Sequence, residues 1–482
     1  MAYEINKIRK EQRYALDRCL ENAHAIITKE YLARLETYDI VKPSLEDLDV
    51  DIAECGRFYR LTRLVIDRKE SFLDKLTTIV NVVSAMDCSI ATIIRSDGSK
   101  IDFYFGIVSK NAREAKETDK RRREANGAAF RGALSGNLTG SGLEELSKEE
   151  IASFREHFLS RKEDSYAAVS GIAAFRDEED RNMETYVQGL ENLADSLKGQ
   201  AYTIVMLADP MDTAQLQAMK QGYEMLHTQL STFAGSSLTL NESDTLSLSD
   251  ARTEGVSEGI SQGIAMTQSR TKSQGKSIGF SAGASLIVQV GFNTGKSSSV
   301  SDTAGRTDSA SRSSQSTRSL TRTESASGTT GKSLQLNYGN RTVKTLLDQI
   351  DRNLERLDEC GSFGAFDCAA YVIAGDRETA LTVAGNYSAL MRGRNSSAQA
   401  SHINAWFRQE DTQILARYLA SLVHPRFRQD GQAGIYVTPA LPVSGRELAI
   451  QMGLPKKSVS GIPVIPMAAF GRNLPDSLGR TL

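Results

Sequence analysis

The 482-residue chain has few cysteines, and no two of them form a CxxC pair: Cys19, Cys55, Cys88, Cys360 and Cys368. An odd and scattered set of thiols fits a reducing compartment better than a disulfide framework. No run of 18 apolar residues occurs, so we expect no transmembrane helix, although this test leaves a β-type insertion open. The formal net charge of -2 favours neither nucleic acid nor a membrane surface as partner. We therefore expect a cytoplasmic protein and leave nucleic-acid binding open.

Motifs for nucleotide and metal chemistry are also missing. Three GKS tripeptides begin at residues 275, 295 and 331, but the glycine that a P-loop needs five residues earlier is replaced by Arg270, Val290 and Ala326. The five histidines show no metal-ligand spacing. Asp209 ends the apolar stretch YTIVMLAD like a magnesium ligand, but we interpret it as a strand end before a proline turn. The expectation is that this chain is not an enzyme and binds no cofactor or metal.

The apolar periodicity predicts an α/β (α+β) body in two halves, residues 1–234 and 336–482. In the first half we expect helices over about 1–35, 109–160, 179–198 and 214–233, and strands over 77–108, 166–175 and 202–207. Asp97-Gly98 is a hairpin turn within 77–108, and a Gly-rich break interrupts the second helix at 132–142. In the second half we expect helices over 343–357, 376–391, 411–423 and 445–452, with Ser444 as an N-cap, and a strand over 368–375.

Residues 235–335 separate the two halves and form a Ser/Thr/Gly-rich insertion. In it small residues occupy the odd-numbered positions and larger ones the even-numbered positions, a regularity that we call parity. From Ser237 to Ser285 all 25 odd positions are Ser, Thr, Gly, Ala or Asn, whereas of the 24 even positions between them only Ala282 and Ala284 are small. From Ser301 to Thr329, 13 of 15 odd positions are Ser or Thr. Composition alone favours a disordered linker, but disorder imposes no parity. Alternation with period two predicts a long β-hairpin instead.

A lone hairpin of this length would be marginally stable and would expose its edges, so we expect several copies to close into an oligomeric β-barrel. The small face would line a lumen or pack closely, and its representatives are Ser247, Ser249, Ser257, Ser261, Ser269 and Ser273. Two sheets stacked through their small faces are the alternative. Near the middle of the insertion the even face becomes apolar, with Ile278, Phe280, Leu286, Val288, Val290 and Phe292. This is typical of a membrane-facing strand, but a hairpin tip that packs on its symmetry mates fits equally well.

Several sequence blocks resemble the N-terminal half of HerA/VirB4-like bacterial ATP-binding proteins. They include FRGALSGNLTG, GYEMLHTQLSTF, LLDQIDRNLERLDECGSFGAFDCAAYVIAGD and GRELAIQMGLPKKSVSGIPVI. Proteins of that class also carry a Ser-rich insertion between two α/β halves. In them a P-loop motor follows a block like FGRN, whereas here Phe470–Asn473 is followed by nine residues. The resemblance therefore implies a relative without its motor, or one whose motor is a separate chain.

The resemblance further implies a homo-oligomeric ring, hexamer-like, in a secretion, conjugation or defence setting, together with a partner ATPase motor chain. Our leading hypothesis is a non-catalytic ring component of a translocation-type assembly whose insertions form a β-barrel conduit. Two alternatives stay open: a pore-forming effector, and the N-terminal fragment of an ATPase whose P-loop domain is missing. Membrane association through the hairpin tip is left open alongside these hypotheses.

Overall fold

The computed structural model describes His24 and residues 27–44, 51–67, 70–86, 88–109, 116–161, 164–174, 189–234, 236–240, 334–338, 341–393, 396, 400–428 and 436–467. The chain divides into two compact units. The first contains Met1–Lys29 and Ala214–Glu355, and the second contains Glu30–Thr213 and Arg356–Leu482. We call the second unit the sheet body. The boundaries expected from composition, 1–234, 235–335 and 336–482, stay a prediction.

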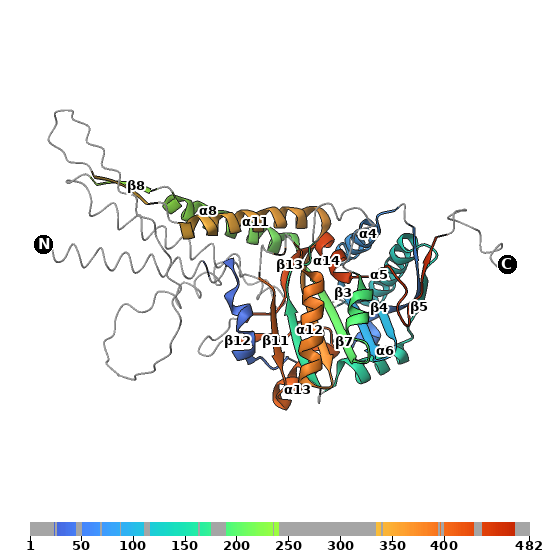
Figure 1. The fold of residues 1–482 in the computed structure, drawn as a ribbon. Coiled ribbons are helices and arrows are strands. Elements are labelled where there is room, and N and C mark those ends of the chain that lie inside the picture. The colour runs from blue at the N-terminus through green and yellow to red at the C-terminus, as the bar shows by residue number, and fades with distance from the viewer. Residues whose placement is uncertain are drawn as a thin grey trace, which may run out of the picture. The chain divides into compact units, whose positions relative to one another are not determined.

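The sheet body is built on a ten-stranded sheet (Figure 1). The strands run in the order β11-β6-β10-β7-β3-β4-β2-β14, with β13 paired to β10 and β5 paired to β2. Their bounds are β2 Gly56–Ile66, β3 Cys88–Asp97, β4 Ile101–Ser109, β5 Gly142–Glu145, β6 Ser165–Ser170, β7 Ala201–Pro210, β10 Ala365–Ala374, β11 His402–Trp406, β13 Leu441–Ser444 and β14 Val464–Pro466. Every pair is antiparallel except β14 with β2. The fold is thus mixed α/β, and none of the described sheets closes into a barrel.

Helices cover both faces of this sheet. One apolar core lies under α4 (Phe72–Ser84), α5 (Lys116–Asn137), α7 (Leu190–Ser196), α12 (Arg377–Met391) and α14 (Gly445–Met452). The other lies under η2 (Leu35–Thr37), α3 (Ile52–Cys55), α6 (Lys148–Phe154), the π-helix η3 (Arg155–Leu159) and α13 (Gln409–Ala420). Because both faces are buried, the central strands are apolar at nearly every position rather than alternating.

The remaining elements are short or belong to the first unit. In the sheet body, η1 spans Glu30–Ala33, and β1 (Asp39–Ile40) pairs with β12 (Phe427–Arg428). The helices α8 (Thr213–Ala234) and α11 (Arg341–Phe363) belong to the first unit for most of their length; along the chain, β8 (Ser236–Leu240) follows α8 and β9 (Leu334–Tyr338) precedes α11. All of 241–333 lies outside the described residues.

Strands from before and after residues 241–333 are neighbours in the sheet. Strand β10 lies between β6 and β7 and pairs with β7 over nine residues, from Phe366 opposite Pro210 to Ala374 opposite Tyr202. Beyond this register the amide of Met211 donates to the carbonyl of Ala365 at 2.9 Å. The two sequence halves therefore build one sheet together.

Most of the expected elements are present, among them the hairpin at Asp97-Gly98. The Asp97 carboxylate accepts the backbone N–H groups of Lys100 at 2.8 Å and Ser99 at 2.9 Å, and these bonds lower the pKa of Asp97 to about 2. Gly98 has a φ of 93°, which L side chains rarely adopt. Ser444 caps α14 as expected, and Glu447 completes a capping box with it.

One predicted strand is wrong. We expected 77–108 to be extended throughout, but α4 covers Phe72–Ser84. The Ser71 hydroxyl caps this helix by accepting from the amide of Asp74, and Leu76, Ile79, Val80 and Val83 recur at helical spacing and are buried. The β-branched residues of TTIVNVV suggested a strand, but the cap and the burial against the sheet override that preference.

Two expected helices also differ in their limits, and a third lies partly outside the described residues. The helix expected over 109–160 is divided: α5 passes through the predicted glycine break as far as Asn137, and β5 and α6 follow it. The helix expected over 1–35 ends earlier, because Glu30–Ala33 is a 3₁₀ turn that follows Lys29 at a φ of 51°, and residues 1–23 lie outside the described part. Of the helix expected over 179–198, the structure describes only α7.

A half-buried ion pair ties α11 to α14. The guanidinium of Arg356 donates to both carboxylate oxygens of Glu447, at 2.8 and 2.9 Å, and to the carbonyl of Pro442 at 2.8 Å. Only 14% of the Arg356 side chain and 12% of the Glu447 side chain are exposed. Bidentate, poorly solvated pairs of this kind leave an uncompensated charge when one partner is removed.

We therefore predict that Arg356→Met lowers the free energy of unfolding by about 3–5 kcal/mol. Lys148→Met is the matched control, because Lys148 pairs with Glu54 at a shorter 2.6 Å but both side chains are more than half exposed. Its expected loss is about 0–1 kcal/mol. Denaturant titration of the two variants measures both values. Equal losses would contradict the claim that the buried ion pair contributes more to stability than the exposed one.

Candidate functional site

The residues singled out from the parity pattern are not placed by the structure. The small-face set (Ser247, Ser249, Ser257, Ser261, Ser269 and Ser273) and the apolar set (Ile278, Phe280, Leu286, Val288, Val290 and Phe292) lie outside the described residues. What the structure does describe is the pair of strands that flank them, the helices that carry these strands, and the point where those helices join the sheet.

The strands β8 and β9 pair with each other in an antiparallel register. Ser236 is opposite Tyr338, Leu238 is opposite Leu336 and Leu240 is opposite Leu334. Even positions are thus paired with even positions, and odd positions with odd ones. We call this two-stranded ribbon the stem. Sequence parity predicted strands here, but only the structure gives their register.

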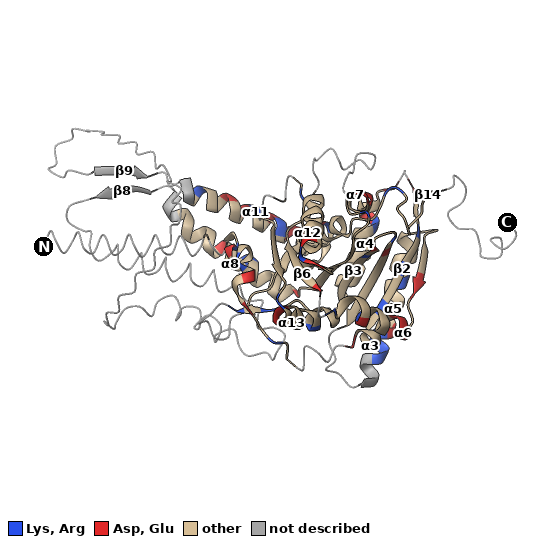
Figure 2. Ribbon diagram, turned by 60° about the horizontal axis from the view of Figure 1, so that its bottom comes forward, with Lys and Arg blue, Asp and Glu red and all other residues tan. Residues whose placement is uncertain are grey.

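The helices α8 and α11 carry the stem and lie side by side (Figures 1 and 2). In each helix most of the buried residues recur at alternating spacings of three and four: Leu216, Met219, Tyr223, Leu226 and Leu230 in α8, and Val343, Leu346, Ile350, Asn353, Leu357 and Cys360 in α11. This narrow stripe is typical of paired, nearly parallel helix axes. Between the helices, the Nε2 atom of His227 lies 3.3 Å from a carboxylate oxygen of Asp351.

Both helices join the sheet at one place. Strand β7 ends at Pro210 and α8 begins at Thr213, while α11 ends at Phe363 and β10 begins at Ala365. Beside this junction a group of polar side chains from separate elements comes together: Ser89, Asp209, Tyr371 and His424, which we call the junction cluster. Ser89, Tyr371 and His424 are buried, and 18% of the Asp209 side chain is exposed.

The hydrogen-bond partners of His424 indicate which nitrogen carries the hydrogen when its ring is neutral. The Nε2 atom of His424 lies 3.1 Å from the carbonyl oxygen of Asp367, which can only accept, so in the neutral ring this nitrogen carries the hydrogen. The Tyr371 hydroxyl then donates to Nδ1 at 2.6 Å. Burial, with a further contribution from the charge of Asp209, raises the pKa of Tyr371 well above its ordinary value, so the hydroxyl keeps its proton.

This arrangement holds the strands together rather than activating a nucleophile. The Ser89 hydroxyl donates to Asp209 at 2.7 Å, and Asp209 in turn lies 3.9 Å from His424. A serine nucleophile would need the histidine as its direct partner, with the aspartate behind it. Across the described ranges, no group of three or more His, Cys, Asp or Glu side chains could hold a metal ion. Asp209 is the next-to-last residue of β7, which ends at Pro210.

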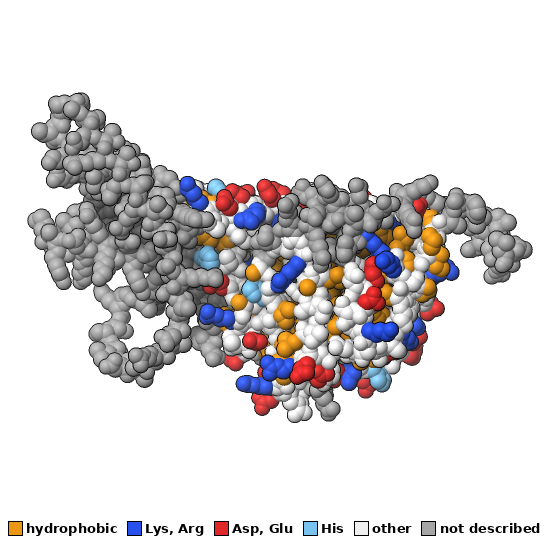
Figure 3. All heavy atoms as spheres, in the orientation of Figure 1, with side chains coloured by type: hydrophobic (Ala, Val, Ile, Leu, Met, Phe, Trp, Pro, Cys, Tyr) orange, Lys and Arg blue, Asp and Glu red, His pale blue; other side chains and the backbone are white. Residues whose placement is uncertain are grey.

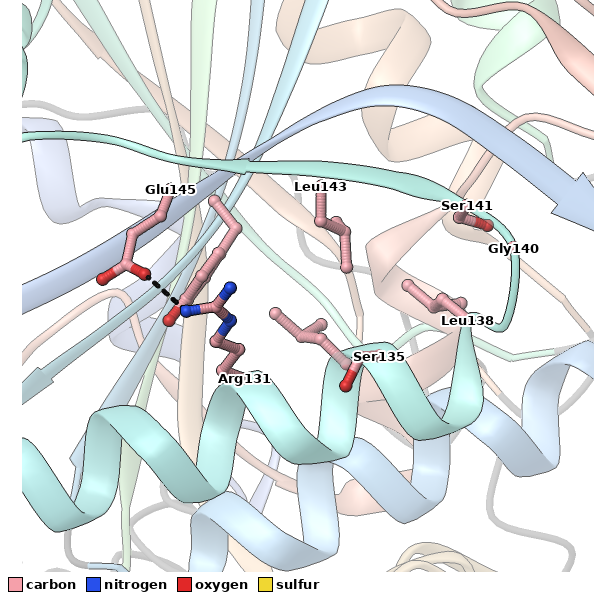
Figure 4. Close-up of a pocket in the computed structure, with 9 residues that line it drawn as sticks. Arg131, Ser135, Leu138, Gly140, Ser141, Leu143 and Glu145 are labelled. Carbon is pink, nitrogen blue, oxygen red and sulfur yellow. Dashed lines mark ion pairs between the residues drawn. The ribbon is translucent and has the colours of Figure 1, made fainter. Parts of the chain in front are cut away.

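A small pocket lies elsewhere in the sheet body, between α5 and β5 (Figure 4). Its cavity volume is about 230 Å³, and Leu134, Leu138 and Leu143 form its apolar part. At one end Arg131 and Glu145 point toward one another, with 3.6 Å between them. Burial and the charge of Glu145 raise the pKa of Tyr59, which also lines the pocket, to about 12. Because Arg131 and Glu145 already neutralise each other, this pocket presents no uncompensated charge to a ligand.

Neither a protein-family model nor a curated protein matches the chain. The resemblance to HerA/VirB4-like proteins therefore stays a prediction from sequence blocks. Within the described ranges, no helix has both the length and the hydropathy to cross a membrane.

A double-mutant cycle tests the junction cluster. Tyr371→Phe leaves the Nδ1 atom of His424 buried without a donor and should lower the free energy of unfolding by about 1–3 kcal/mol. In a His424→Leu background the same change should cost much less, because the phenol has already lost its acceptor. Chemical denaturation of the two single variants and the double variant gives the coupling energy. Strictly additive losses would show that the bond between Tyr371 and His424 contributes nothing.

Proposed function

We propose that this chain is a non-catalytic ring component of a translocation-type assembly, and that the segment between the stem strands continues as a hairpin that joins its copies in a β-barrel conduit. The observation that carries the proposal is the register of the stem, in which even positions pair with even and odd with odd. Residues directly opposite each other in an antiparallel pair have side chains on the same face. A continued register therefore keeps all odd positions of both arms on one face.

The sequence pattern supports this continuation. The small residues occupy odd positions in the first arm, Ser237 to Ser285, and odd positions again in the second arm, Ser301 to Thr329. A register shifted by one residue would oppose the small face of one arm to the large face of the other. Only a register that pairs odd positions with odd positions gives the whole ribbon a small, hydroxyl-rich face, and the stem has that register.

The same register sets the point where the chain would reverse. The midpoint of residues 236 and 338, and equally of 240 and 334, is residue 287. Ile287 lies within the apolar stretch Ile278–Phe292, so the proposal puts the apolar residues at the far end of the ribbon. Continued to that point, each arm would be roughly 150 Å long at about 3.3 Å per residue.

A ribbon of two strands cannot be stable alone at that length. Its outer edges would have unpaired backbone groups along both arms, and isolated hairpins are marginal in water. Pairing each ribbon with the ribbons of neighbouring copies satisfies both edges, and closure into a barrel leaves none unpaired. The hydroxyl-rich face then suits a water-filled interior. This reasoning favours a homo-oligomer. A separate ATPase chain as the source of movement belongs to the proposal through the resemblance of the sequence blocks alone.

Distances between spin labels test the register. The labels are attached to non-natural amino acids, so that the native cysteines stay in place. In the continued register Ser257 and Thr317 are directly opposite each other, and their backbones lie within about 10 Å of one another. Ser257 and Thr307 would be about 33 Å apart along the ribbon. A flexible chain predicts the reverse order, because 60 residues separate the first pair and 50 the second. Labelled chains are diluted with unlabelled ones, so that only distances within one chain are measured. A shorter distance from Ser257 to Thr307 than from Ser257 to Thr317 would contradict the hairpin.

Bulky substitutions on each face test its role. Ser257, Ser261 and Ser269 replaced together by Leu add bulk to the small face, and Glu258, Gln262 and Gln268 replaced by Leu add the same bulk to the other face. If the small face lines a lumen or packs closely, the first set abolishes the assembled particle in light scattering, while the second leaves its mass unchanged and lowers solubility. Identical behaviour of the two sets would contradict a defined small face.

A further inference from the structure

The pocket between α5 and β5 has an apolar centre and one charged end (Figures 3 and 4). Along α5, Arg131, Leu134 and Leu138 recur at spacings of three and four, so they lie on one face of the helix. On β5, Leu143 and Glu145 are two residues apart and therefore point to the same side of the strand. The helix face and the strand face meet across the pocket, with the leucines in the middle and Arg131 and Glu145 at one end.

The apolar part is large enough for one ring. Tyr59 of β2 lines it and is itself packed edge to face on Phe130 of α5, with 5.8 Å between the ring centres. Leu134 and Leu138 are buried and Leu143 is half-buried. The cavity volume is about 230 Å³, whereas an apolar cavity of about 150 Å³ already binds benzene. A single ring with one polar substituent therefore fits.

The charged end keeps unused hydrogen-bonding positions. Arg131 and Glu145 are 3.6 Å apart, which neutralises their charges but is longer than a hydrogen bond. Arg57 approaches the other carboxylate oxygen to 4.0 Å and does not line the pocket. A guanidinium has five N–H donors and a carboxylate about four acceptor positions, of which the Tyr59 hydroxyl occupies one. Donors and acceptors thus lie side by side at this end.

A neutral group with an acceptor and a donor on neighbouring atoms matches this end best. A carboxylate would accept from Arg131 but lie against Glu145, and an ammonium group would donate to Glu145 but lie against Arg131. Each leaves one pair of like charges in contact. An amide accepts from the guanidinium through its oxygen and donates to the carboxylate through its nitrogen. It also loses less solvation than an ion on entering the pocket.

We propose that this pocket binds a small neutral molecule that carries an amide group on a single apolar ring. The ring lies among Leu134, Leu138 and Leu143, and the amide lies between Arg131 and Glu145. The proposal assigns a ligand site within the sheet body. It goes beyond the proposed function and depends on neither the ring nor the insertion.

Three probes with the same phenyl ring test the class of ligand: benzamide, benzoate and benzylamine. At pH 7 benzamide is neutral, benzoate is an anion and benzylamine is a cation. Ligand-detected NMR on the purified full chain measures each dissociation constant. Benzamide should bind in the millimolar range, as expected for so few atoms, and each charged probe at least tenfold more weakly. Absence of benzamide binding, or equal binding of the three probes, would overturn the proposal.

A substitution that fills the cavity tests the location. Leu143→Trp should weaken benzamide binding at least tenfold, because the larger side chain occupies the place of the ligand. Leu146→Trp is the matched control: Leu146 is also half-buried and lies close by in the chain, but it packs against the other core and does not line the pocket. Benzamide that binds the Leu143→Trp variant as tightly as the native chain would show that its site is elsewhere.

Exchanging the charged end tests what selects the ligand. Arg131→Met leaves Glu145 facing the pocket and should raise benzylamine binding at least tenfold relative to benzoate, whereas Glu145→Met should do the reverse. Arg131 is 70% and Glu145 40% exposed, so both variants should fold. Arg155→Met is the control, because Arg155 pairs with Asp51 at 3.3 Å outside the pocket. An order of the probes that stays the same in both pocket variants would contradict selection by the ion pair.

Discussion

The pairing of β7 with β10 is the constraint on which the rest of the structure depends. Strand β7 comes just before the arm formed by α8 and α11, and β10 comes just after it. Because the two strands are antiparallel neighbours, the chain leaves the sheet and returns to it at adjacent points. The two helices have nearly equal lengths, 22 and 23 residues, so β8 and β9 are reached after similar lengths of helix. A stem in antiparallel register is the natural continuation of that geometry.

Two polar interactions strengthen this region from different sides. On one face of the sheet, His424 joins the end of β7 to β10 through Asp209, Tyr371 and the carbonyl of Asp367. At the start of β10, Arg356 fixes the last turns of α11 to Glu447 of α14. Both interactions are poorly solvated, so each depends on complete pairing of its partners. Both interactions lie within the sheet body, and the loss of a single side chain from either leaves its partner incompletely paired.

Much of the fold could be predicted from the sequence because its signals are local. The stripes of three and four spacings in α8 and α11, the Asp97-Gly98 turn and the Ser444 cap each require only neighbouring residues. The segment 77–84 was wrongly predicted because a short apolar run with β-branched residues fits a buried helix and a buried strand equally well. The junction cluster could not be foreseen at all: Tyr371 and His424 are 53 residues apart, and only the sheet order brings Asp209 to them. The alternation of small and large residues over 237–329 predicted strands, and the structure gives a register only for the flanking pair β8 and β9.

The central claim is that copies of this chain assemble into a ring whose insertions form one conduit. Single-particle imaging of the purified protein tests it most directly. The account predicts a ring of sheet bodies with a narrow tube of β-structure on the ring axis, and it predicts that deletion of residues 241–333 removes the tube. Separate sheet bodies with no common axis, or rings in which the deletion removes no axial density, would contradict it.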